Sequence, residues 1–461
     1  MHVECGRIGT AIMVQMKSIF TELMHIVSRL ALPLLASVLC ARGAAAQPGS
    51  DEYALMGYDG PATHNRVAAL ADKLASGAVK LEYKGNRGYL DSLLAALDID
   101  PHSQLLVFSK TSLQYPLIDG DHPRAVYFND DTYIGWVQNS NLVEVMTMDD
   151  ALGVVFYLFH NVDRQEQPFD RQSQRCLVCH DSSGAAVGGT PQLMAASSVY
   201  NFADNLVQDM NGNDNVTDKT PLEKRWGGWY VSGLSGKQKH LGNVRLQSSE
   251  QLPQLDKLLR LNLPTLTGHD LFDTAPYLRD TSDIVALLVL EHQLTVENQL
   301  TYVRFKAPAV LARNGLADAA KAATWAGLPD RGQKVLTRML DELVRLMLLT
   351  NAASFADRID GSAEFQHAFV ARGPVDGSGR SLRQFDLQHR LFRYPLSYLI
   401  YSSYFDHLPG YAKDYVYLQL AAVLEGRRQE PSFNQLTDTQ RRDLVAILRA
   451  TKPEFVPYLT R

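Results

Sequence analysis

Two cysteines and a histidine in one short segment are the residues of this chain best suited to chemistry. Residues 176–180 read Cys-Leu-Val-Cys-His. Two thiols three positions apart can add to the two vinyl groups of one porphyrin, and the adjacent histidine is then held beneath the iron. We therefore expect Cys176 and Cys179 to form the thioether links of one covalent haem c, with His180 as the proximal iron ligand.

Two other kinds of site also use a cysteine pair, and the surrounding sequence favours neither. A zinc site needs further ligands, usually a second pair of Cys or His at motif spacing. Beyond residue 46 the chain has no other cysteine and no closely spaced pair of histidines. A redox-active dithiol would open a helix after a strand, whereas the flanks RQSQR and HDSSGAAVGG are polar and glycine-rich.

The N-terminal segment is typical of an export signal. Residues 30–41 form an apolar run, LALPLLASVLCA, that follows Arg29. The run has the length of a signal-peptide core and is too short to span a bilayer. Ala44 and Ala46 stand at the small-residue positions of a cleavage site, which predicts a signal peptide over 1–46. We expect a periplasmic or secreted protein that keeps no transmembrane anchor after cleavage.

Composition and charge narrow the class of protein further. The 461 residues are 46% apolar and 21% charged, which is typical of a globular chain. There are 45 Lys and Arg against 50 Asp and Glu, a net charge of -5, and no basic block. Nucleic acid is therefore not an expected partner. The chain also lacks the cysteines for a disulfide framework, so its stability must come from its core.

The single haem motif resembles that of the c-type cytochromes. The resemblance implies an iron-binding protein with one covalent haem, and the ligand on the other face of the iron then decides the chemistry. Methionine or histidine would favour electron transfer, whereas an open position would favour binding or catalysis. Our candidates for a distal ligand are His240, in the segment RWGGWYVSGLSGKQKHLGN, and Met194; an open iron is the third possibility. His292 lies in an apolar helical segment, where it would either face the iron or be a satisfied core histidine.

Hydrophobic periodicity predicts the elements that position these residues. Short apolar runs separated by turn clusters over 104–160 predict an antiparallel meander of four or five strands. Residues 227–232 are expected to form a strand, with His240 opening the return strand. Helical spacing predicts helices over 62–98, 283–305, 331–351, 383–407, 411–426 and 437–451, and Thr437 with Gln440 has the pattern of a capping box.

These elements predict an α+β fold that is predominantly helical. A short antiparallel β meander would precede the c-type haem-binding region, and a helical C-terminal half would follow it. We expect three parts: a signal peptide over 1–46, a haem-bearing region with the meander and the motif over 47–280, and a helical region over 281–461.

A wider resemblance is carried by three segments, VYFNDDTYIGWV, the lone CLVCH, and RWGGWYVSG with KHLGN. Together they are similar to a group of large exported bacterial proteins described as containing a cytochrome c domain. The similarity spans most of residues 100–300 and implies haem without naming a reaction. That pattern has a His shortly after the Asp that precedes RWGGWY, but Lys219 follows Asp218 here, so no ligand is assigned there.

The sequence thus predicts an exported monohaem c-type cytochrome that acts in one-electron transfer. The alternative is a haem-dependent oxidoreductase of peroxidase or oxygenase type, or a redox or gas sensor, with an open sixth iron position. Its partner would be a redox partner protein in the first case and a small-molecule substrate in the second. The sequence does not decide whether the protein is an enzyme.

Overall fold

The computed structural model describes residues 50–460 except 63, 164–168, 182–188, 211–214 and 434. The expected signal peptide over 1–46 lies outside the described residues. Residues 51–461 form one compact unit. The expected regions 47–280 and 281–461 therefore contribute to a shared core within that unit.

A seven-stranded antiparallel sheet is the framework of this unit. Its order is β6-β5-β4-β3-β2-β1-β9, so the six strands β1 to β6 lie side by side in sequence order. Five of them, β1 to β5, form the meander expected over 104–160. A second, three-stranded sheet has the order β10-β7-β8. The strands are β1 Leu105–Val107, β2 Arg124–Phe128, β3 Thr132–Trp136, β4 Leu142–Asp149, β5 Gly153–His160, β6 Phe169–Arg171, β7 Ser198–Asn201, β8 Leu206–Asp209, β9 Trp229–Tyr230 and β10 Arg245–Leu246.

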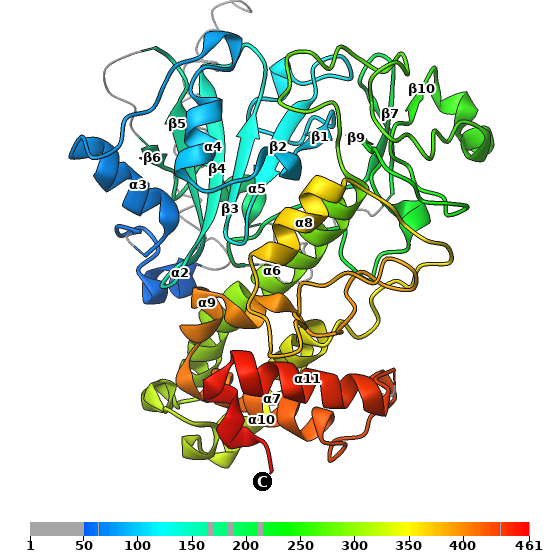
Figure 1. Cartoon of the computed structure of the whole chain (residues 1–461). Helices are drawn as coiled ribbons and strands as arrows, with labels where there is room; N and C mark the ends of the chain where they lie inside the picture. The colour runs from blue at the N-terminus through cyan, green and yellow to red at the C-terminus, as the bar shows by residue number, and fades with distance from the viewer. Residues whose placement is uncertain are drawn as a thin grey trace, which may run out of the picture. The chain divides into compact units, whose positions relative to one another are not determined.

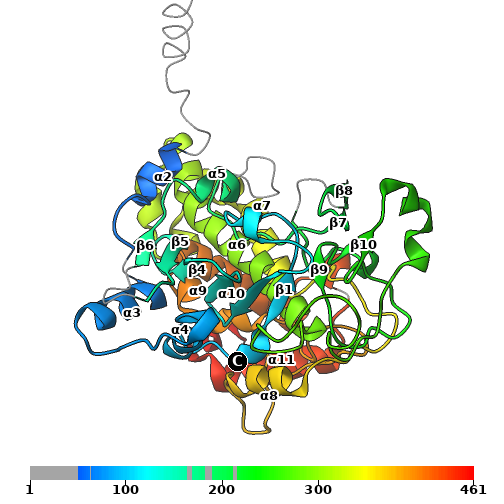
Figure 2. The ribbon, with the colours of Figure 1, turned by 90° about the horizontal axis from the view of Figure 1, so that it is seen from above.

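Both faces of the large sheet are covered. Successive side chains of a strand point to opposite faces, so each strand contributes residues to two cores. Val143 and Val145 of β4 belong to the core on the side of α3 and α4. Met148 of β4 and Phe156 of β5 belong to the core on the side of α6. Figures 1 and 2 show the sheet between these two groups of helices.

The helices differ widely in length, and most of the longer ones follow the sheet in the sequence. Helices α7, α10 and α11 pack together at one end of the molecule (Figure 1). The described helices are α2 Ser50–Met56, α3 Arg66–Ala75, α4 Leu90–Ala96, α5 Leu177–His180, α6 Ile284–Arg313, α7 Asp330–Met347, α8 Ala363–Ala371, α9 Ser403–Asp406, α10 Gly410–Leu424 and α11 Asp438–Thr451.

Helix α6 is buried on all sides over most of its length, from Ile284 to Thr301. Its polar side chains therefore need partners inside the core. Glu291 accepts hydrogen bonds from the Arg225 guanidinium at 2.6 Å and from the Trp226 indole at 2.9 Å. Burial raises the pKa of Glu291 to about 6, against the effect of Arg225, which leaves the carboxylate charged at neutral pH.

The expectation of a predominantly helical fold is wrong. Helical segments take 40% of the described residues and strands take 14%, and the large sheet is the central layer. The sheet is wider than the expected meander because β6 and β9, from later in the chain, pair with β5 and β1 at its two edges.

Two of the expected helices are mostly not helical in the structure, which explains part of the overestimated helical content. The stretch 62–98 contains only α3 and α4, because Gly77, at a φ of 74°, ends α3 in a conformation that continues no helix. The stretch 383–407 is largely irregular and contains only short helical turns. There Leu387 has a φ of 57°, and Phe385 forms an isolated bridge with Phe392, so the chain turns back on itself. The expected helices over 283–305, 331–351, 411–426 and 437–451 are confirmed as α6, α7, α10 and α11, with the capping box of Thr437 and Gln440.

The expected hairpin between residues 227 and 240 is also wrong. The strand is only two residues long, as β9, and it pairs with β1 rather than with a return strand. The following residues Ser232, Gly233 and Leu234 form isolated bridges with three separate segments, at Asp283, Leu263 and Asp360. His240 lies in irregular backbone beyond them.

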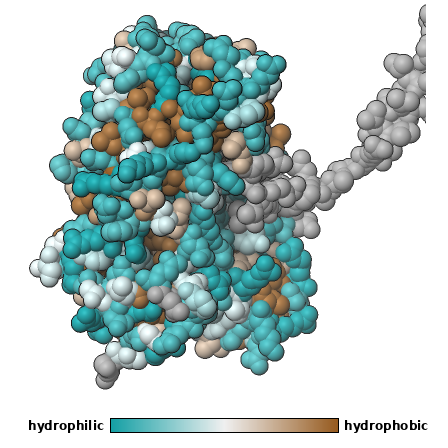
Figure 3. Space-filling model, turned by 90° about the vertical axis from the view of Figure 1, so that its right-hand side faces the viewer, coloured by the Kyte–Doolittle hydropathy of each residue, from teal (hydrophilic) through white to brown (hydrophobic). Residues whose placement is uncertain are grey.

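The surface is mostly hydrophilic, with apolar side chains gathered mainly in the upper half of the face in Figure 3. In the part of the chain that the structure describes, no helix is both long enough and apolar enough to cross a membrane.

We expect Glu291→Ala to lower the free energy of unfolding by about 3–5 kcal/mol, because Arg225 would stay buried without its carboxylate. Chemical denaturation followed by circular dichroism measures the loss. The control is Asp318→Ala, which should leave the unfolding midpoint unchanged. The side chain of Asp318 is 99% exposed and that of its ion-pair partner Lys321 is 83% exposed. Equal midpoints for the wild type and Glu291→Ala would contradict the role of this pair.

Candidate functional site

The cysteine motif forms a single helical turn at the surface. The turn is α5, Leu177–His180, and the N–H of His180 donates to the carbonyl of Cys176 at 2.9 Å. Both cysteines are free; Cys176 is half-buried and Cys179 is exposed. Val178 between them is 80% exposed. The segment between the two thiols is therefore open to approach from outside.

The ring of His180 is turned inward and held by one hydrogen bond. Its Nδ1 lies 2.7 Å from the carbonyl oxygen of Gln192, so Nδ1 carries the proton and donates. The ring packs against Phe156 of β5, with 4.8 Å between the ring centres. Burial lowers the pKa of His180, which favours the neutral ring. A neutral imidazole with its Nδ1 bound to a carbonyl has Nε2 left to bind a metal.

Helix α6 fixes the residue that holds His180. Asn298 accepts from the N–H of Leu193 at 2.8 Å and donates to its carbonyl at 2.8 Å. Gln192, next to Leu193, donates its N–H to the carbonyl of His180 at 2.9 Å. Sequence reasoning missed Gln192 because it acts through its backbone, which no residue type marks. It missed Asn298 because no local pattern distinguishes this amide side chain from the others of α6.

Beside the motif the sheet carries a half-buried ion pair. Arg124 of β2 donates to Glu144 of β4 at 2.9 Å, and Ser112 donates to the other oxygen of Glu144 at 2.6 Å. Both charges act on the ring of His180. Gly135 lies on β3 between the two strands, and a side chain there would meet Arg124 and Glu144 at 3.4–3.5 Å. The absence of a side chain leaves room above the sheet at this point.

The Nε of Arg124 is buried and has no hydrogen-bond partner among the described residues. A free guanidinium N–H is a strong donor to a carboxylate, and a haem carries two carboxylates as propionates. The thiols, the oriented His180 and this donor are together of the right chemical kinds to hold a haem.

The thiol of Cys176 is unsuited to dithiol redox chemistry. Burial is the main cause that raises its pKa to about 11, and Glu144 adds to the effect. A redox-active pair needs a thiol whose pKa is lowered, since the thiolate is the nucleophile. Within the described ranges, no group of three or more His, Cys, Asp or Glu side chains comes together to hold a metal ion.

His240 and His180 have separate sets of contacts in the structure. His240 is buried, its Nδ1 accepts from the N–H of Gly242 at 3.2 Å, and its ring lies against Trp226. Burial lowers the pKa of His240 to about 4, so the ring is neutral. The contacts of His180 are instead with Phe156 and Gln192.

Two methionines lie in segments that contain the contacts of His180. Met194 follows Gln192 by two residues and is 37% exposed. Met146 is half-buried on β4, directly opposite Phe156 of β5. Paired residues share a face of the sheet, so Met146 lies on the face where the ring of His180 packs. Sequence reasoning did not single out Met146, although the alternation in LVEVMT places it on the same face as Glu144.

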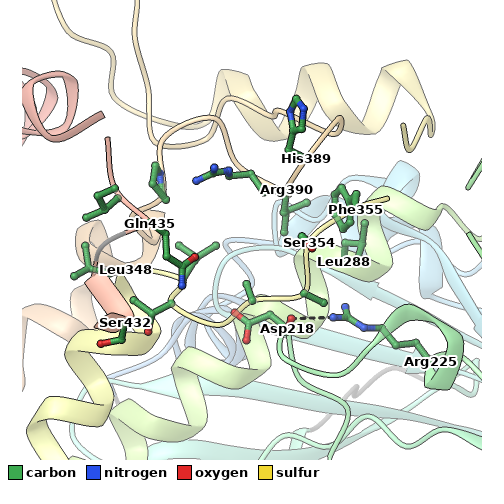
Figure 4. Close-up of a pocket in the computed structure, with 17 residues that line it drawn as sticks. Asp218, Arg225, Leu288, Leu348, Ser354, Phe355, His389, Arg390, Ser432 and Gln435 are labelled. Atoms are coloured by element: carbon green, nitrogen blue, oxygen red, sulfur yellow. Dashed lines mark hydrogen bonds between the residues drawn. The ribbon is translucent and has the colours of Figure 1, made fainter. Parts of the chain in front are cut away.

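His292 is a core histidine with both ring nitrogens engaged, where we had expected an iron-facing histidine or a satisfied core or surface one. Its Nδ1 lies 3.1 Å from Asp218 and its Nε2 lies 2.8 Å from the hydroxyl of Ser397. This order of groups is that of a catalytic triad, but Ser397 is fully buried. Figure 4 shows the neighbouring pocket, of about 110 Å³, which Asp218 lines together with Arg225. Since Ser397 does not line that pocket, the arrangement offers no nucleophile to a substrate there.

Comparisons with models of protein families, with curated proteins and with solved structures found no match to this chain. The function is therefore argued from the site itself.

We expect Cys179 to be alkylated well before Cys176 in protein made without haem attachment. At pH 8 about one in a thousand Cys176 thiols, with a pKa of about 11, is ionised to the reactive thiolate. In an ordinary cysteine about one quarter of the thiols are ionised at this pH. Iodoacetamide should therefore modify Cys176 about a hundredfold more slowly than an unperturbed cysteine. Peptide mass mapping over time measures both rates. Faster modification of Cys176 than of Cys179 would favour a redox-active dithiol.

Proposed function

We propose that this protein is an exported monohaem c-type cytochrome that transfers single electrons. One covalent haem c would be linked to Cys176 and Cys179, with His180 as its proximal iron ligand. The observation that carries the proposal is the hydrogen bond from Nδ1 of His180 to the carbonyl of Gln192, at 2.7 Å. It leaves Nε2 for the iron in a motif whose two thiols are both free.

The chain's own residues would orient and tune the iron ligand. Donation to the carbonyl of Gln192 holds the imidazole in one tautomer and one direction and makes Nε2 more basic. Phe156 packs against the ring at a tilt, with 4.8 Å between the ring centres, and so restricts its rotation. Arg124, through its free Nε, would bind a haem propionate.

A bound haem would supply an iron that cycles between the ferric and ferrous states. The chain contributes an attachment turn at the surface, where Val178 is 80% exposed and Cys179 is open to solvent. A redox partner protein can therefore approach this edge closely. Covalent attachment takes place outside the cytoplasm, which agrees with a leader over 1–46 and a periplasmic or secreted location.

The second candidate is a haem oxidoreductase or a sensor with an open sixth iron position. It is favoured by the Nδ1 of His240, which already accepts from the N–H of Gly242, and by its ring lying against Trp226, so this side chain is engaged within the protein. If neither methionine near the motif binds the iron, a small substrate or gas would have access to it.

We expect the chain, exported in cells that attach haem c, to gain the mass of one haem that survives denaturation. Cys176→Ala and Cys179→Ala should each leave one thioether link, and the double variant should keep none. Intact mass measurement and haem staining of a denaturing gel report the links. Val178→Ala, between the two thiols, is the control and should stay fully loaded. Covalent haem in the double variant would contradict the attachment site.

We expect the reduced protein to be low-spin and its absorption spectrum to be unchanged by carbon monoxide, because two protein ligands would close the iron. His240→Ala, Met194→Ala and Met146→Ala each remove one side chain able to bind the iron, and the variant that loses the second ligand should be high-spin and open to carbon monoxide. The control Met210→Ala should leave the spectrum unchanged.

The outcomes separate the two candidate functions. Rapid binding of carbon monoxide by the wild type would overturn the electron carrier in favour of the oxidoreductase or sensor. A spectral change in one of the three variants alone would support the carrier and identify its distal ligand.

A further inference from the structure

The small pocket beside Asp218 has room for a ligand and opens to the surface. It is the pocket drawn in Figure 4, and its volume is about 110 Å³. A cavity of about 150 Å³ can hold benzene, so this pocket suits a ligand of about six non-hydrogen atoms. His389 and Arg390 line it, with side chains that are 73% and 35% exposed, so a small molecule can enter from solvent.

Asp218 offers this pocket a carboxylate oxygen that the protein does not use. The side chain is only 10% exposed. Within the described part of the chain its one hydrogen-bond partner is Nδ1 of His292, 3.1 Å from one of the two oxygens. The carbonyl of Asp218 accepts from the N–H of Ala353 at 2.7 Å and from Arg225 at 2.9 Å, which fixes the residue in place. The second carboxylate oxygen is therefore a buried acceptor for a donor in the pocket.

Arg390 supplies a cation to the same pocket. Its side chain makes no hydrogen bond to any residue that the structure describes, and its Nε lies 3.9 Å from Asp386. The carbonyl of Arg390 accepts from the N–H of Leu387 at 2.8 Å, in the turn where Leu387 has a φ of 57°, so the backbone is held. The two terminal nitrogens of the guanidinium are left to bind a carboxylate in a fork.

One short segment holds Asp218 and the turn of Arg390 close to each other. The N–H of Ala353 donates to Asp218, and the N–H of Phe355 donates to the carbonyl of His389 at 2.9 Å. Residues 353 and 355 are at most about 7 Å apart along the chain. Asp218 and Arg390 consequently border a single small space, and Figure 4 shows them on opposite sides of it.

The charges around this space nearly balance. Arg225 also lines the pocket, but Glu291 and two backbone carbonyls bind its guanidinium, so it has little to offer a ligand. Asp218, Glu291 and Asp386 stand against Arg225 and Arg390, which leaves an excess of one negative charge with the histidines uncharged. A ligand that is itself neutral overall, and that carries one charge of each sign, matches this arrangement.

We propose that this pocket binds a free α-amino acid with a short aliphatic side chain, of the size of alanine or valine. The ammonium group would donate to Asp218, and the carboxylate would accept from Arg390. Leu288, Leu348 and Phe355 give the pocket an apolar wall for the aliphatic side chain. None of the lining residues belongs to the cysteine motif, so the site does not depend on the proposed haem.

Calorimetric titration of the full exported protein with L-alanine and with L-valine tests the proposal. We expect one saturable site for at least one of the two. Ethylamine and isobutylamine are the same molecules without the carboxylate, and propionate and isovalerate are the same molecules without the ammonium group. Each of these should bind at least tenfold more weakly than its parent amino acid, because one charged residue of the pocket would lose its partner.

Two variants test the two charged groups separately. Arg390→Gln and Asp218→Asn should each weaken amino-acid binding about tenfold or more. Asp218→Asn keeps the size of the side chain and an oxygen for His292. Arg393→Gln is the matched control, an exposed arginine three residues further on that does not line the pocket, and it should bind like the wild type.

Three results would overturn the proposal. The first is the absence of saturable binding for both amino acids. The second is equal affinity in the wild type and in Arg390→Gln, whose side chain holds no other described residue by a hydrogen bond; circular dichroism checks that both variants are folded. The third is binding of the amines or of the carboxylic acids as tight as that of the amino acids, which would assign the pocket to a ligand with a single charge.

Discussion

The geometry of the motif depends on the pair of hydrogen bonds between Asn298 and the backbone of Leu193. One amide side chain on α6 satisfies both the N–H and the carbonyl of one residue in an extended segment, at 2.8 Å each. The next residue back, Gln192, then meets His180 twice, at its ring and at its backbone. The direction of the imidazole is therefore set by a buried helix far along the chain, not by the motif.

That helix can do this because several of its other polar groups also have partners inside the core. Glu297 accepts from the hydroxyls of Tyr133 and Tyr404, and Gln293 links Tyr133 to Tyr398. Burial raises the pKa of Glu297 well above its ordinary value. A buried polar network of this kind fixes the rotation and translation of a helix more narrowly than apolar packing does, because each misplaced group would lose its partner. Asn298 consequently presents its amide at a defined place.

The sequence was informative where the physical signal is local. Short apolar runs between turn clusters over 104–160 predicted the meander, helical spacing after 283 predicted α6, and Thr437 with Gln440 predicted a helix start. The sequence was misleading where contacts with distant segments determine the secondary structure. Residues 383–407 have the apolar spacing of a helix, yet the chain turns at Leu387. Residues 232–234 pair with three distant segments and form no hairpin. For the site, the motif itself was readable, but Gln192, Arg124 and Met146 come from segments that only the fold brings to it.

The motif needs such outside support because one helical turn does not hold its own shape. Nucleating a turn fixes several residues for a single hydrogen bond, so α5 would be marginal alone. Residues at i, i+3 and i+4 of a helix share one face, which places Cys176, Cys179 and His180 together only while the turn persists. The hydrogen bonds between His180 and Gln192 close that turn from its C-terminal end. The same contact that orients the ring therefore also keeps the thiols at the spacing that attachment requires, while leaving Cys179 at the surface.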